Sequence, residues 1–152
     1  MADPAHPSPN PFGESAPKDD RVGLAANAMA AAMALAIAAI AVVTWATTYV
    51  AANSGITSRE NITDGTAVNL LIYGTAIAVF GSAGVAWLLM GPVDSNYRRG
   101  GLAMVSAFGG FMLSVILTMM VRGVLGTTAL LGLAAVAAVV AAWFARRARA
   151  AV

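Results

Sequence analysis

The side chains best suited to chemistry are few and widely spaced in this chain. Inside its apolar stretches, Asn27, Asn69 and Tyr73 are the polar groups most open to a functional role, and Asn69 and Tyr73 lie one helical turn apart. Such groups could bind a solute within a membrane. All three lie near the ends of apolar stretches, where water or backbone groups satisfy them easily. We therefore interpret them as structural.

Eight methionines raise the question of copper, because thioether sulfur is a soft metal ligand. Met29 and Met33 share a helical face, as do Met112 and Met119. A copper route would need several thioethers to converge, usually with cysteine or histidine. The chain has no cysteine, and its one histidine, His6, lies in the N-terminal tail. Methionine is interpreted as flexible filler, and neither a metal nor another cofactor is predicted.

The sequence lacks the signatures of an enzyme or an ion-coupled carrier. It contains no phosphate-binding glycine loop, HExxH, GxSxG or paired intramembrane carboxylates, and Glu60, Asp64 and Asp94 are interpreted as loop or capping residues. Carriers of protons and cations usually keep an ionisable residue inside the membrane. None lies within the apolar stretches. We expect no catalysis and no coupling to a proton or sodium gradient.

The elements that hold these residues are set by four uncharged intervals: Val22–Ser58, Gly65–Val93, Gly100–Val121 and Gly123–Ala145. Each exceeds the ~20 residues that a helix needs to cross a bilayer. Backbone groups in lipid must be paired internally, and the alternating pattern of barrel strands is missing. The sequence predicts an all-α membrane protein, an up-down-up-down bundle of four transmembrane helices over 21–152, with spans at about 22–50, 66–90, 100–121 and 126–145.

The segments outside the spans carry fewer signals. Residues 1–20 hold five of the six prolines and are predicted to be a disordered cytoplasmic tail. The first helix is expected to start after Asp19-Asp20, and a cleavable signal peptide is the competing interpretation of this region. The connection between the third and fourth helices is very short. These two helices are therefore predicted to be antiparallel neighbours.

Bulk composition agrees with a membrane protein and argues against a nucleic-acid partner. Hydrophobic residues make up 59% of the chain, charged residues 11%, and the mean hydropathy is +0.76. A net charge of +2 is too small to suggest binding of nucleic acid. The lipid bilayer is the partner that this composition predicts most directly.

Lysine and arginine are distributed unevenly between the two sides of the predicted bundle. Two, Arg59 and Arg122, fall on one side, and seven fall on the other: Lys18, Arg21, Arg98, Arg99, Arg146, Arg147 and Arg149. The positive-inside rule places the richer side, with both termini, in the cytoplasm. The arginines at 98, 99, 146, 147 and 149 are predicted to contact lipid headgroups. The alanine-rich composition is typical of a bacterial or phage gene, so the predicted location is the inner (cytoplasmic) membrane.

Small residues recur at every fourth position in each predicted helix, which allows backbones to approach closely in lipid. The rows predicted as packing or partner faces are Gly74, Ala78, Ser82 and Ala86 in the second helix and Ser106, Gly110, Ser114 and Thr118 in the third. Similar rows are Ala26, Ala30, Ala34 and Ala38 in the first helix and Ala134, Ala138 and Ala142 in the fourth. These faces are expected to pack the helices together, or to bind a partner or a second copy.

These observations favour a non-catalytic integral membrane subunit, an accessory or assembly component of a larger membrane complex. A self-associating pore such as a phage holin is the alternative, because it would also be small, multi-spanning and basic at its C-terminus. A passive channel for a small solute is the third hypothesis.

Overall fold

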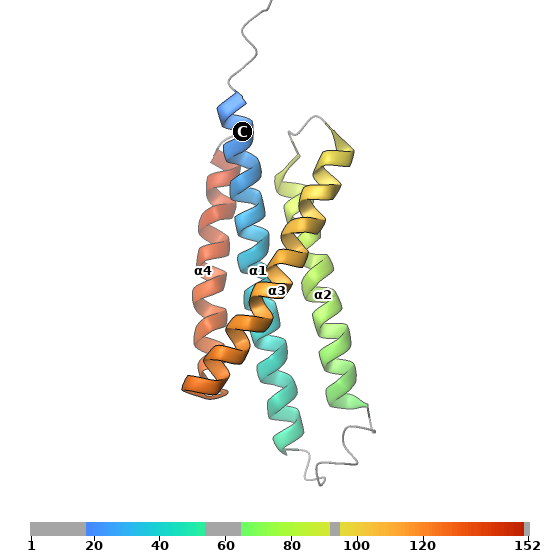
Figure 1. Ribbon diagram of the computed structural model, residues 1–152, viewed down its shortest axis with the longest axis vertical. Coiled ribbons are helices and arrows are strands. Elements are labelled where there is room, and N and C mark those ends of the chain that lie inside the picture. The colour runs from blue at the N-terminus through green and yellow to red at the C-terminus, as the bar shows by residue number, and fades with distance from the viewer. Residues whose placement is uncertain (1–17, 54–64, 92–94, 151–152) are drawn as a thin grey trace, which may run out of the picture.

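The computed structural model describes residues 18–53, 65–91 and 95–150, with side chains from residue 22 onward. These residues form four α-helices (Figure 1): α1 Lys18–Asn53, α2 Thr66–Leu89, α3 Asn96–Leu125 and α4 Ala129–Ala150. Each is long and apolar enough to cross a membrane. The prediction of an all-helical, multi-pass membrane protein is confirmed at this level. The predicted tail lies outside the described residues except for residues 18–20, which belong to α1.

Helix ends follow local capping chemistry and extend beyond some predicted spans. The Ser95 side chain accepts a hydrogen bond from the Arg98 amide at 3.4 Å and caps α3. The same helix continues past Arg122 to Leu125 and ends at Gly126, whose φ of 86° favours glycine. α4 extends to Ala150 because arginines suit the last turn of a helix.

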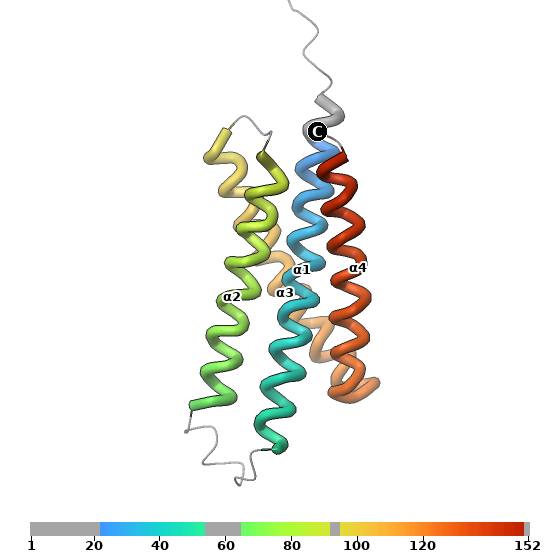
Figure 2. The backbone as a smooth tube through the Cα atoms, turned by 180° about the vertical axis from the view of Figure 1, so that it is seen from behind, coloured from blue at the N-terminus to red at the C-terminus, as the bar shows by residue number. Residues whose placement is uncertain are grey.

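Helix α1 is the centre of the molecule. Its 36 residues extend about 54 Å at about 1.5 Å per residue, and it contacts all three other helices, whereas α2 and α4 barely touch. Figure 2 shows α2 and α4 on opposite sides of α1, with α3 crossing behind. The prediction that the third and fourth helices are neighbours is wrong for most of their length, because α3 leans away from their shared turn while α4 follows α1 (Figure 1).

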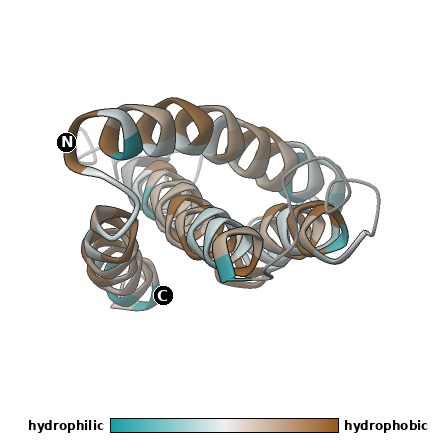
Figure 3. Cartoon of the chain, turned by 90° about the horizontal axis from the view of Figure 1, so that it is seen from below, coloured by the Kyte–Doolittle hydropathy of each residue, from teal (hydrophilic) through white to brown (hydrophobic). Residues whose placement is uncertain are grey.

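The buried apolar core is made of small side chains. Among the described residues it consists of alanine, apart from Leu24, Ile37, Ile40, Met90 and Leu130. Large apolar side chains lie outside: Ile77 is 72% exposed, Leu88 76% and Val139 70%. Figure 3, seen from below, shows hydrophobic colour along the helices. This distribution suits a lipid solvent, in which close backbone approach replaces hydrophobic burial as the source of packing energy.

All four helices contribute to one buried cluster near the C-terminal end of α4. Its buried members are Leu24, Ala28 and Ala32 of α1, Ala86 and Met90 of α2, Ala103 of α3 and Ala148 of α4. A second cluster has buried members from α1 and α4 alone: Ile37, Ala38 and Ala137. Leu117 of α3, which is partly buried, packs against them. The cluster in which all four helices pack together therefore lies at one end of the molecule, near the C-terminal end of α4.

Candidate functional site: a basic end and an intramembrane pocket

The small-residue rows of α2 and α3 lie largely against α1. All four members of the α3 row are buried, and in α2 Ala78, Ser82 and Ala86 are buried while Gly74 is half-buried. A Cβ atom added at Gly110 would lie 2.9 Å from Cα and 3.1 Å from the carbonyl oxygen of Met33. One added at Gly74 would lie 2.8 Å from a methyl group of Val43. Glycine is therefore required where α3 meets the α1 backbone.

The predicted rows on the other two helices need correction. Of the predicted row in α4, only Ala134 is buried, whereas Ala138 and Ala142 are exposed. The buried face of α4 instead comprises Leu130, Ala134, Ala137, Ala141 and Ala148. Successive steps of four residues drift by about 40° around a helix of 3.6 residues per turn, whereas alternating steps of four and three stay on one face. The same drift carries the α1 row from buried Ala34 and Ala38 to exposed Ala26.

Buried hydroxyl groups in the spans are satisfied by their own helices. Ser106 donates to the Ala103 carbonyl at 2.9 Å, Ser114 to Phe111 at 2.6 Å and Thr118 to Ser114 at 2.7 Å. Ser82 donates to Val79 at 2.8 Å in the same way. Side chains bonded to backbone carbonyls are structural polar groups. The described residues contain no cluster of three or more histidine, cysteine, aspartate or glutamate side chains.

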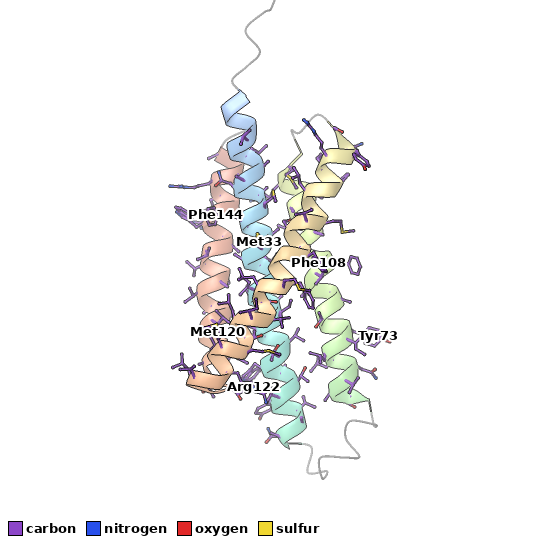
Figure 4. The ribbon with its side chains drawn as sticks, viewed as in Figure 1. Met33, Tyr73, Phe108, Met120, Arg122 and Phe144 are labelled. Atoms are coloured by element: carbon purple, nitrogen blue, oxygen red, sulfur yellow. The ribbon has the colours of Figure 1, made fainter. Side chains whose placement is uncertain are left out.

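The polar residues first considered for chemistry do not converge. Asn27 is half-buried in α1, Asn69 is exposed near the start of α2, and Tyr73 is 66% exposed and points away from the helices (Figure 4). Met33 lies beneath the glycines of α3, whereas Met112 and Met119 are exposed. His6 lies outside the described residues. The described part of the chain therefore offers these groups no common site.

Two tryptophan–arginine pairs mark one end of the molecule. The Arg99 guanidinium lies 4.5 Å from the Trp87 ring centroid and donates to the Trp87 carbonyl at 2.8 Å. The Arg147 guanidinium lies 3.9 Å above Trp143. The start of α3 and the end of α4 lie at this same end (Figure 1). We name it the basic end: half-buried Arg99 with exposed Arg98, Arg146, Arg147 and Arg149.

The Arg99–Trp87 contact connects the last turn of α2 to the first turn of α3. A cation is favourable at a helix C-terminus, where carbonyl groups lack helical donors. Charge-assisted hydrogen bonds contribute about 1.5–3 kcal/mol and exposed cation–π contacts about 0.5–1 kcal/mol. Because Arg99 is only half-buried, we expect Arg99→Ala to lower the free energy of unfolding by about 1–2 kcal/mol.

Arg98→Ala is the matched control for this prediction. Arg98 is exposed on the same helical turn, and its capping bond uses the backbone amide, which alanine retains. We expect a change within about 0.5 kcal/mol. Chemical unfolding in mixed micelles measures the free energy of unfolding of both variants. Equal losses for the two variants would show that the Trp87 contact does not stabilise the α2–α3 connection.

A pocket of about 210 Å³ lies between α1, α2 and α3. Its apolar walls are Ile40, Phe111, Val115 and Met119, and its polar residues are Thr44, Thr75, Thr118 and Arg122. Arg122 lies toward the end of α3 opposite the basic end (Figure 4). Sequence reasoning misses this pocket because its residues come from three helices. The one feature of the sequence that points to the pocket is Arg122, a cation that lies one helical turn beyond Thr118 on the same face of α3.

Similarity to known proteins does not add to these observations. Comparisons of the chain with protein-family models, with curated proteins and with solved structures found no match. The basic end, the pocket and the helix faces therefore carry the functional argument.

Proposed function

We propose that this protein is a non-catalytic integral membrane subunit of a larger complex. In this proposal its four helices cross the bacterial inner membrane alternately, as an up-down-up-down bundle with both termini in the cytoplasm. The role is that of an accessory or scaffold component. The observation that supports this role best is the core around α1. Its buried side chains are small, and its buried hydroxyl groups donate to backbone carbonyls of their own helices.

The basic end supports the proposed orientation. Five arginines of α3 and α4 gather there beside Trp87 and Trp143, and tryptophan concentrates at membrane interfaces. Lys18 and Arg21, at the start of α1, add to the same side. Arginines next to a span bind anionic headgroups, and lysine and arginine concentrate on the cytoplasmic side of membrane proteins. This end therefore suits the cytoplasmic surface.

A face of α2 supports contact with another membrane protein. Gly81 and Gly84 are exposed, and a Cβ atom on either would meet nothing within 4 Å. They lie in line with exposed Ile77 and Leu88, on the side of α2 away from its buried row. Glycines flanked by large apolar residues allow a second helix to approach closely.

Water-filled pore formation is less well supported than a subunit role. A self-assembled pore needs a polar face on its outer surface to line the channel. In the described spans, Ser82, Ser106, Ser114 and Thr118 are buried and bonded to their own helices. Large apolar side chains are common among the exposed described residues, which suits contact with lipid or another apolar span.

The proposal is tested by the composition of the purified particle. The chain carries a C-terminal tag at its native expression level and is extracted in mild detergent. Light scattering and mass spectrometry are expected to find a particle well above the chain's 15.4 kDa that contains other membrane proteins in fixed ratio. A large particle made of this chain alone would favour the holin-like pore.

A matched pair of variants locates the contact. Gly84→Leu places bulk on the exposed face of α2 and is expected to lower recovery of the partner without lowering the midpoint of thermal unfolding, since leucine is a better helix former than glycine. Val139→Leu, on the outer side of α4, is the control, since it is 70% exposed and far from that face. Partner recovery unchanged by Gly84→Leu would exclude the α2 face as the contact.

A further inference from the structure

The pocket between α1, α2 and α3 combines two kinds of wall. Ile40, Phe111 and Val115 form an apolar lining within the membrane-spanning part of the helices. Arg122 completes the lining in the last turn of α3. An apolar recess bordered by a cation matches an amphiphile with a hydrocarbon chain and a negatively charged head.

Among the described residues that line this pocket, Arg122 is the one that carries a charge, and this charge is positive. Residues 22–53, 65–91 and 95–150 contain no aspartate or glutamate. The guanidinium of Arg122 therefore has no carboxylate partner among them, and its planar fork suits the oxygens of a phosphate. The Thr118 hydroxyl donates to the Ser114 carbonyl and is not free to donate to a phosphate, which leaves the Arg122 guanidinium as the donor for a lipid head.

The depth of the pocket fits a membrane lipid better than a soluble molecule. Thr44 of the pocket precedes Trp45, whose ring stacks on Tyr49 at a centroid distance of 5.5 Å. Aromatic pairs of this kind sit at the membrane interface. Arg122 is then at headgroup depth, while Phe111 lies about three turns deeper along α3, where acyl chains are the available ligand.

We propose that this pocket binds one anionic phospholipid of the surrounding bilayer. Its phosphate lies on Arg122, and part of one acyl chain enters between α1, α2 and α3. The lipid fills space between α1, α2 and α3, away from the cluster in which all four helices meet. The site depends on membrane insertion but not on the proposed complex, so it is testable on the isolated chain.

The test uses the full chain in bilayer nanodiscs doped with a photoreactive phospholipid. The probe carries a diazirine on one acyl chain and either a phosphatidylglycerol or a phosphatidylcholine head. Mass spectrometry compares labelling of Phe111, Val115 and Met119 with labelling of Val139, which faces lipid on α4. We expect the ratio of pocket to Val139 labelling to be about fivefold higher for the anionic probe, the order expected of one arginine at a membrane interface.

Three variants decide between a site and general contact with lipid. Arg122→Gln is expected to remove the preference for phosphatidylglycerol, and Arg122→Lys to retain most of it. Arg149→Gln, which removes an exposed cation from the basic end, should leave it unchanged. A ratio equal for the two probes in the wild type, or a preference that survives Arg122→Gln, would overturn the proposal. Thermal unfolding confirms that each variant is folded.

Discussion

Gly110→Leu is expected to disrupt the packing of α3 on α1 and to lower the stability of the protein sharply. Even the first carbon of the new side chain would lie 2.9 Å from Cα of Met33, which is backbone and cannot rotate away. Overpacking typically costs about 1–3 kcal/mol, and the upper end is expected here because three more carbons must also be placed. The measurement is thermal unfolding in detergent, with monodispersity by gel filtration.

Two controls separate crowding from a general effect of substitution in α3. Gly101→Leu makes the same change on the same helix, where a Cβ atom meets nothing within 4 Å, and Leu113→Ile alters a side chain that is 40% exposed. Leu113→Ile is expected to stay within about 0.5 kcal/mol of the wild type. Gly101→Leu should not destabilise the protein and should add up to about 1 kcal/mol, because leucine is a better helix former than glycine. If Gly110→Leu behaves like Gly101→Leu, the close contact between α3 and α1 is wrong.

Ala28→Leu is expected to have the second large effect, because Ala28 lies where all four helices meet. It is fully buried in the cluster with Ala86 of α2, Ala103 of α3 and Ala148 of α4. Three more carbons there must displace at least one of the surrounding helices, at a cost of about 1–3 kcal/mol. Chemical unfolding in mixed micelles gives the free energy directly.

Ala26→Leu is the matched control, two residues away on the same helix. Ala26 is exposed, so the added side chain points into lipid or detergent and should leave stability nearly unchanged. Leucine and alanine are both good helix formers, so propensity does not confound the comparison. Equal stability of the two variants would contradict the central position of α1.

The sequence predicts the helices well because each contains a long uncharged stretch. Ser95, a residue type that favours helix N-termini, caps α3, and α2 ends at Leu89, just before Gly91-Pro92. Proline and glycine act through local backbone geometry, which is readable without a fold. The same local reasoning places Gly110 in a row whose members all turn out to be buried.

Features that depend on how helices cross are not readable in this way. Alanine occurs on every side of α4, so its spacing does not distinguish buried Ala137 from exposed Ala138. The oblique path of α3 decides which helix covers α4, and no residue in the short turn before α4 encodes it. Arg99 is predicted as a headgroup ligand, yet its guanidinium is partly engaged by the Trp87 carbonyl. Tertiary placement alone brings these groups together.

We propose that the chain crosses the membrane four times with both termini in the cytoplasm. This topology is tested most directly by fusing two reporters after Ala52, Gly91, Gly126 and Val152: alkaline phosphatase, active only outside the cytoplasm, and green fluorescent protein, fluorescent only inside it. We expect phosphatase activity after Ala52 and Gly126, and fluorescence after Gly91 and Val152. Fluorescence after Ala52, or phosphatase activity after Val152, would contradict it.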